Sequence, residues 1–207
     1  MTRAAAKALA AVVIGGSAGC VEVLSSLLPA FDAACGLPIL LVVHLPRERP
    51  SRLAELFAPK CRVRVMEAED KLPLEQGVIY VAPPDYHLLV DEGAQLSLAA
   101  DELVHHSRPS IDVLFESAAD VYGSALLGII LSGASSDGAT GLAAIARAGG
   151  LTFVQSPEDA VASTMPQAAL KAAPESSVMS VAKIADELRT INAGLDPQHA
   201  AAPRVSP

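Results

Sequence analysis

Short apolar runs alternate along this chain with segments of helical periodicity. The runs cover residues 11–15, 37–43, 78–82, 126–131 and 151–155, and glycine, proline or polar residues bound each of them. Runs of this kind predict strands that are buried on both faces of a sheet. Apolar residues recur at helical spacing between the runs, which predicts helices over residues 21–28, 52–58, 110–122, 138–148 and 180–191.

This alternation predicts an α/β fold, a doubly wound, mostly parallel, Rossmann-like sheet with helices on both faces. Residues 62–98 depart from the alternation and predict an antiparallel addition, with an edge strand at 62–66 and a hairpin that pairs 88–90 with 95–98. The order Ser156-Pro157-Glu158-Asp159 predicts that a further helix begins there. We expect one domain over residues 1–192 and a disordered tail over residues 193–207.

Composition narrows the classes of function. The 207 residues are 51% hydrophobic and carry a net charge of -8, which disfavours binding to nucleic acid or to an anionic membrane. Cys20, Cys35 and Cys61 form no CxxC pair, so neither a zinc site nor a disulfide framework is predicted, and a reducing cytoplasm is the expected compartment. No apolar stretch approaches the length of a membrane span. We expect no metal and no cofactor.

Three candidate catalytic residues each follow a predicted strand. Ser17 follows the strand at 11–15, His44 the strand at 37–43, and Asp137 the strand at 126–131. The carboxyl ends of parallel strands share one edge of a sheet, so these side chains are expected to lie together. A hydroxyl, an imidazole and a carboxylate can serve as nucleophile, base and orienting acid. Ser17 also lies in Gly15-Gly16-Ser17-Ala18-Gly19, a G-x-S-x-G turn between a strand and a helix.

Each of these residues also has a non-catalytic interpretation. The turn around Ser17 is compatible with a bare tight turn or a phosphate-binding loop. His44 is compatible with a buried structural histidine, and Asp137 with the N-cap of the helix that follows it. The chain order Ser, His, Asp differs from that of α/β-hydrolases and of trypsin-like and subtilisin-like enzymes. The residues therefore form a triad on another scaffold or no triad.

Six stretches of the chain occur together in an order typical of one enzyme family. They cover residues 13–19, 43–46, 79–87, 108–115, 131–139 and 165–166. Through them the chain resembles, over residues 11–190, the catalytic domain of the bacterial chemotaxis protein-glutamate methylesterases (CheB-type). The resemblance implies that Ser17, His44 and Asp137 are the family's triad. It also implies hydrolysis of glutamate methyl esters on methyl-accepting chemotaxis receptors, often with deamidation of receptor glutamine.

Further site residues are expected around this triad. Backbone N–H groups near Ala18 and Ala134 would bind the oxyanion, and Arg108 is a candidate for a cation beside an acidic receptor helix. The chain departs from the family at four positions. Ala18 stands where the family usually has threonine, Cys20 where it has glycine, Gly16 where it has alanine, and Ala134 where it has methionine. The resemblance also implies control of the esterase by a receiver domain. The first strand begins almost at the N-terminus, so we expect any such regulator to be a separate partner.

Two other functions compete with the esterase. The departures favour a non-catalytic module on a degenerate esterase fold, which would bind a receptor or a regulator. A nucleotide-binding domain that uses the turn at 15–19 is a third possibility, although the chain lacks the full G-x-G-x-x-G pattern and an acidic residue to bind a ribose after the second strand.

Overall fold

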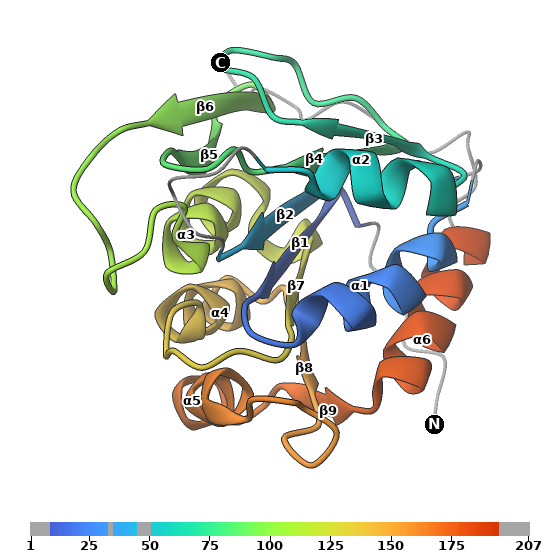
Figure 1. Ribbon diagram of the computed structural model, residues 1–207, viewed down its shortest axis with the longest axis vertical. Helices are drawn as coiled ribbons and strands as arrows, with labels where there is room; N and C mark the ends of the chain where they lie inside the picture. Colours follow the sequence, from blue (N-terminus) through green and yellow to red (C-terminus); the bar gives the residue numbers. More distant parts are fainter. Residues whose placement is uncertain (1–8, 33–34, 45–50, 195–207) are drawn as a thin grey trace.

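A seven-stranded sheet forms the centre of the molecule. The computed structural model describes residues 9–32, 35–44 and 51–194. Across the sheet the strands stand in the order β3-β4-β2-β1-β7-β8-β9, and every neighbouring pair is parallel (Figure 1). The strands are β1 (Ala11–Gly16), β2 (Ile39–Val43), β3 (Arg64–Glu67), β4 (Val78–Val81), β7 (Leu126–Ile130), β8 (Leu151–Gln155) and β9 (Ser177–Met179). The predicted doubly wound α/β fold is confirmed.

Helices cover both faces of this sheet. The helices α1 (Cys20–Leu27), α2 (Leu53–Phe57) and α6 (Val181–Gly194) lie on one face. The other face carries α3 (Ile111–Tyr122), α4 (Ala139–Arg147), α5 (Thr164–Ala172) and the hairpin of β5 (His87–Asp91) and β6 (Gln95–Ala99) (Figure 1). Short 3-10 turns follow α1, α2 and α3 at Leu28–Ala30, Ala58–Lys60 and Gly123–Ala125.

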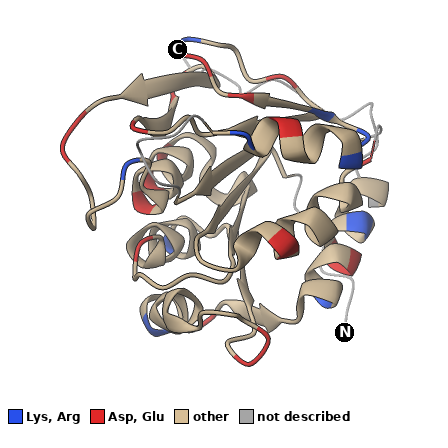
Figure 2. Cartoon of the chain, viewed as in Figure 1, with Lys and Arg blue, Asp and Glu red and all other residues tan. Residues whose placement is uncertain are grey.

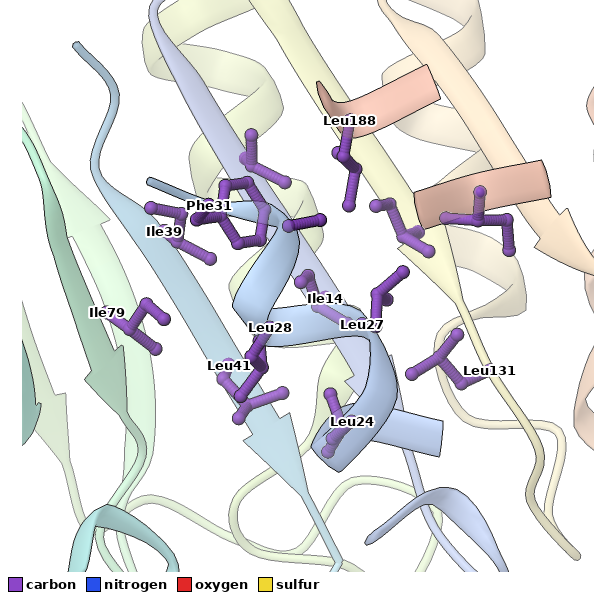
Figure 3. Packing of buried hydrophobic residues seen from close by; sticks show 14 of the residues in the cluster. Ile14, Leu24, Leu27, Leu28, Phe31, Ile39, Leu41, Ile79, Leu131 and Leu188 are labelled. Carbon is purple, nitrogen blue, oxygen red and sulfur yellow. The ribbon is translucent and has the colours of Figure 1, made fainter. Parts of the chain in front are cut away.

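The apolar runs of the sequence become strands that are buried on both sides. Alternate residues of β1 point to opposite faces, with Val12 and Ile14 in one core and Ala11 and Val13 in the other. Figure 3 shows the first core, where Leu24, Leu27 and Leu28 pack over β1 and β2. Continuous burial on two faces explains why the strands show no alternation of apolar and polar residues.

The prediction for residues 62–98 is partly wrong. β5 and β6 do form the expected antiparallel hairpin, and β3 does lie at an edge. However, β3 and β4 pair parallel to each other within the main sheet. The segment that joins them runs beside β6, where the N–H of Leu96 donates to the carbonyl oxygen of Leu72 at 2.9 Å and Leu74 donates to Ala94 at 3.0 Å. The hairpin thus covers a crossover that contains no helix, which local sequence patterns do not reveal.

The predicted helix start at Ser156 is wrong as well. Ser156 begins a turn closed by a bond from Asp159 N–H to its carbonyl oxygen, and α5 begins only at Thr164. The intervening segment consists of turns and bends, and its Ala162 backbone bonds to Ser132 and Gly133. The short strand β9 escaped prediction, since its three residues are largely exposed. Helix α6 continues to Gly194, and the rest of the predicted tail lies outside the described residues.

Charged residues lie on the helices, the loops and the outer strands β3 and β5, and are absent from the central strands. Figure 2 shows acidic and basic residues interspersed around the sheet, with none drawn on β1, β2 or β7. Any charge that acts at the sheet edge must therefore come from the segments that follow the strands. Within the part of the chain that the structure describes, no helix is both long and apolar enough to cross a membrane.

Candidate active site

His44 and Asp137 meet at the carboxyl edge of the sheet. His44 directly follows β2, and Asp137 lies between β7 and α4. The Nε2 atom of His44 is 2.7 Å from Oδ2 of Asp137, although the two residues are 93 positions apart in the sequence. The Asp137 side chain is fully buried and that of His44 is 14% exposed. The structure therefore joins the predicted base to the predicted orienting acid.

Ser17 lies beside His44 at the same edge. It follows Gly16 of β1, and Gly16 pairs with Val43, the residue before His44. The backbone extends this pairing, because the N–H of His44 donates to the carbonyl oxygen of Gly16 at 3.2 Å. Neighbouring strands stand about 4.8 Å apart. The structure thus brings Ser17 and His44 to adjacent places, with Ser17 only partly buried.

Asp137 does not cap the helix that follows it. Helix α4 has Gly138 as its N-cap and no side-chain cap. The Asp137 carboxylate instead accepts hydrogen bonds at the start of α3, from the N–H groups of Ile111 at 2.7 Å and Asp112 at 3.0 Å. It also accepts a bond from the Ser110 hydroxyl at 2.7 Å. Asp137 therefore caps α3 instead of α4, and its Oδ2 atom also bonds to His44.

These bonds keep Asp137 ionised. Burial by itself raises the pKa of this carboxyl group, because a charge is poorly solvated inside the protein. The hydrogen bonds from His44, Ile111, Asp112 and Ser110 outweigh burial and hold the pKa of Asp137 below its usual value. A negative Asp137 accepts a hydrogen bond from the imidazole and so fixes the orientation of the ring.

The turn after Ser17 requires glycine at position 19. Gly19 is the N-cap of α1 and adopts a left-handed conformation with φ of 79°. A Cβ atom there would also collide with the side chain of Val161, from the loop before α5. Glycine therefore allows the loop before α5 to close over the turn that carries Ser17.

Two backbone N–H groups, one in this turn and one in the loop after β7, are available as donors. Within the described parts of the chain, no hydrogen-bond acceptor is found for the N–H of Ala18 or of Ala134. The buried Ser132 holds the loops that carry them, since its hydroxyl donates to the carbonyl oxygen of Ala18 at 2.7 Å and accepts from the N–H of Ala162 at 2.9 Å. Available N–H groups on a fixed loop are what an oxyanion hole needs.

Arg108 directs its guanidinium group towards the protein. Its Nε and Nη2 atoms donate to Oδ1 of Asp85 at 3.1 and 2.7 Å, and Nη1 donates to the carbonyl oxygens of Ala100 and Asp101. The side chain is 18% exposed. Arg108 thus holds the segment before α3 against the loop before β5. A direct contact of Arg108 with a substrate stays a prediction.

Sequence reasoning missed the role of His87 and Ser110. The N–H of Ser110 donates to Nδ1 of His87 at 3.1 Å, and the Ser110 hydroxyl bonds to Asp137. Both residues lie in stretches that carry the family resemblance, at 79–87 and 108–115, and that signal could have identified them. Sequence spacing could not, because the contacts join separate parts of the fold.

Two other arrangements near the site have structural explanations. Burial raises the pKa of the Cys20 thiol to about 12, which makes Cys20 a poor nucleophile although it lies close to Ser17 in the sequence. His105, Asp112 and Asp137 each offer an atom within 4.8 Å of the others, a spacing that a metal ion could bridge. Asp112 and Asp137, however, already accept hydrogen bonds from the starts of α4 and α3.

Comparison with known proteins identifies the family to which the chain belongs. A family model described as CheB methylesterase matches residues 12–188. A relative from Leptospira interrogans is 42% identical over 176 residues, which are 85% of this chain and 91% of that protein. The protein-glutamate methylesterase/protein-glutamine glutaminase of Trichodesmium erythraeum is 35% identical over 86% of this chain, and this chain spans 51% of that relative.

A solved structure gives the same result. The CheB methylesterase catalytic domain of Thermotoga maritima matches 88% of this chain and 98% of its own length, with a TM-score of 0.83 and 27% sequence identity. The resemblance predicted from the motifs is confirmed, and the chain belongs to the CheB methylesterase family.

Proposed function

We propose that this chain is a protein-glutamate methylesterase, a serine hydrolase whose triad is Ser17, His44 and Asp137. The 2.7 Å contact between His44 Nε2 and Asp137 Oδ2, beside the strand end that precedes Ser17, carries the proposal. A serine hydroxyl is a weak nucleophile unless an oriented base removes its proton. The family membership and the names of its relatives support the same reaction.

The reaction is an acyl transfer to Ser17. The Nε2–H of His44 donates to Asp137, so Nδ1 carries the lone pair that takes the proton from the Ser17 hydroxyl. Oγ then forms a bond to the ester carbonyl carbon, and the N–H groups of Ala18 and Ala134 bind the oxyanion, each stabilising it by about 3 kcal/mol. When the intermediate collapses, the C–O bond to the methoxy group breaks and methanol leaves with the proton from His44. Water then attacks the acyl-serine, with His44 again as base, and releases the glutamate carboxylate.

The proposed substrates are methylated glutamates of methyl-accepting chemotaxis receptors. Glutamine would follow the same steps, with ammonia in place of methanol, in keeping with the second activity in the relatives' names. We place Arg108 at the edge of the substrate surface and a separate receiver-domain protein as regulator. A cytoplasmic location belongs to this proposal, and the free thiols of Cys20, Cys35 and Cys61 agree with a reducing compartment.

Methanol release from methylated receptor membranes tests the proposal. Purified protein should release methanol, and Ser17→Ala should abolish the release while leaving the unfolding free energy almost unchanged. Ser26→Ala is a matched control, because Ser26 is exposed in the last turn of α1, at the opposite end of that helix from the turn that carries Ser17. A fluorophosphonate should label the unmodified protein and the Ser26→Ala variant but not Ser17→Ala.

The same assays can disprove the proposal. Methanol release by Ser17→Ala at the unmodified rate would exclude Ser17 as the nucleophile. A folded protein that neither releases methanol nor reacts with the fluorophosphonate would favour the non-catalytic module. Addition of receiver-domain proteins to the methanol assay tests the proposed regulator, which predicts a change in rate on addition.

A further inference from the structure

Ser110 stands at the N-cap of α3, but its hydroxyl does not cap that helix. An N-cap serine ordinarily accepts a hydrogen bond from an N–H in the first turn of its own helix. Here Ser110 makes no such bond, and its Oγ donates to Oδ1 of Asp137 at 2.7 Å. Ser110 is fully buried. The hydroxyl therefore acts on the carboxylate of a distant segment.

His87 holds the backbone of Ser110. Its Nδ1 accepts the N–H of Ser110 at 3.1 Å, so Nδ1 carries a lone pair and the ring hydrogen is on Nε2. Nε2 donates to the carbonyl oxygen of Glu102 at 3.0 Å, and His87 is 2% exposed. These bonds fix the position of Ser110, and therefore the position from which its hydroxyl donates to Asp137.

Asp112 and Asp137 link the starts of α3 and α4 reciprocally. Asp137, just before α4, accepts N–H groups in the first turn of α3. Asp112, in the first turn of α3, accepts the N–H of Gly141 in the first turn of α4 at 2.7 Å. Asp137 thus caps α3, the helix that contains Asp112, and Asp112 caps α4, the helix that follows Asp137. This link fixes where the Asp137 carboxyl group lies, with one backbone N–H of α3 on each of its oxygens.

Four hydrogen bonds reach Asp137 from the residues that the structure describes, and they divide evenly between its two oxygens. Oδ2 receives Ile111 N–H and His44 Nε2, and Oδ1 receives Ser110 Oγ and Asp112 N–H. We propose that Ser110 is a positioning residue, which sets the plane of the Asp137 carboxylate and so aims Oδ2 at His44. This inference rests on the proposed function, because the orientation of His44 matters only if His44 is the base. Among the described residues, loss of the hydroxyl would leave Asp112 N–H, at the longer distance of 3.0 Å, as the donor to Oδ1.

The test compares Ser110→Ala, Ser110→Thr and Ser117→Ala. Ser117 lies on the same helix, and its part-buried hydroxyl accepts from Val90 N–H and donates to Val113, without contact to Asp137. Ser110→Ala should lower kcat for methanol release roughly tenfold with KM unchanged, since the base is misaligned but substrate contacts remain. Ser117→Ala should keep the unmodified kcat even where its loss of stability is similar. Ser110→Thr keeps the hydroxyl and should restore most of kcat.

A second measurement does not depend on activity. The proton between His44 and Asp137 should give a downfield proton NMR resonance that is absent in His44→Ala. We expect Ser110→Ala to shift or broaden this resonance and Ser117→Ala to leave it in place. An unchanged resonance and an unchanged kcat in folded Ser110→Ala protein would overturn the inference, as would an equal fall in kcat for Ser117→Ala. If no variant releases methanol but the resonance behaves as expected, the proposed function fails and the positioning of Asp137 stands.

Discussion

Gly16 and Cys20 share one space beside the turn that carries Ser17. A Cβ atom built on Gly16 would lie 2.8 Å from Cβ of Cys20 and 3.0 Å from its Sγ. Both positions differ from the pattern of the family that the chain resembles, in which alanine usually stands at position 16 and glycine at position 20. The two departures therefore compensate each other, because the side chain of Cys20 occupies the space that a residue-16 methyl group would need.

A double-mutant cycle tests this compensation. Gly16→Ala alone should lower the free energy of unfolding by about 2 kcal/mol, because an extra methyl group overpacks a buried site. Combination with Cys20→Gly should recover about 1 kcal/mol or more relative to the sum of the single changes, measured by urea unfolding. Gly16→Ala with Cys61→Ala, at a partly buried cysteine near β3, should be additive. Additivity in the Cys20 pair as well would contradict the shared space.

Asp137→Asn should lower both stability and activity. At pH 7 the substitution removes charged hydrogen bonds at the start of α3, and we expect a loss of about 2 to 3 kcal/mol in unfolding free energy. The rate of methanol release should fall about 10⁴-fold, since asparagine cannot hold the base in its active tautomer. Asp120→Asn, at an exposed site in the last turn of α3, should change neither quantity appreciably.

The stability difference should also depend on pH. The folded pKa of Asp137 lies below its unfolded value of about 3.9, so its contribution is present above that value and is lost as the pH falls through the folded pKa. The gap between the unmodified protein and Asp137→Asn should therefore shrink as the pH falls from about 5 to 3. Asp112 acts in the opposite sense, because burial, with a smaller contribution from the charge of Asp137, raises its pKa. A gap that stays constant over this range would contradict an ionised Asp137.

Gly138→Ala should cost more stability than Gly93→Ala. Both glycines have a left-handed backbone, with φ of 92° and 83°, so alanine is strained at either position by about 1 kcal/mol. At Gly138 a Cβ atom would also lie 2.6 Å from Cδ1 of Ile130 and 2.7 Å from Cγ2 of Ile111, whereas nothing lies within 4 Å at Gly93. We expect a further loss of about 1 to 3 kcal/mol at Gly138 from this overpacking. Equal losses in urea unfolding would show that the loop before α4 can shift freely.

Arg108→Glu and Asp85→Asn together separate two roles of Arg108. Both changes break the ion pair that holds the segment before α3, but Asp85→Asn leaves the cation in place. If Arg108 meets an acidic receptor surface, Arg108→Glu should raise KM about fivefold, as expected for one exposed charge pair, and Asp85→Asn should leave KM almost unchanged. An equal rise in both variants would mean that Arg108 acts only by holding the loop.

Local sequence patterns determined most of the secondary structure and the place of the candidate triad. Continuous apolar runs predicted β1, β2, β4, β7 and β8, because short runs of this kind, bounded by glycine, proline or polar residues, are typical of strands buried on both faces. The predicted parallel strands place Ser17, His44 and Asp137 at one edge of the sheet, since each follows a strand end. That step needed no knowledge of any side-chain contact.

Tertiary structure alone decided what the site residues bind. Asp137 reads as a cap for α4 in the sequence, yet it caps α3, and Ser110 reads as a cap but donates to Asp137. The direction of β3 beside β4 and the late start of α5 at Thr164 were likewise hidden. A pattern of polar and apolar residues reports burial and local backbone preference. The Asp137 carboxylate bonds to Asp112, 25 residues away in the sequence, and to His44, 93 residues away. These partners depend instead on how α3 packs against α4 at the sheet edge.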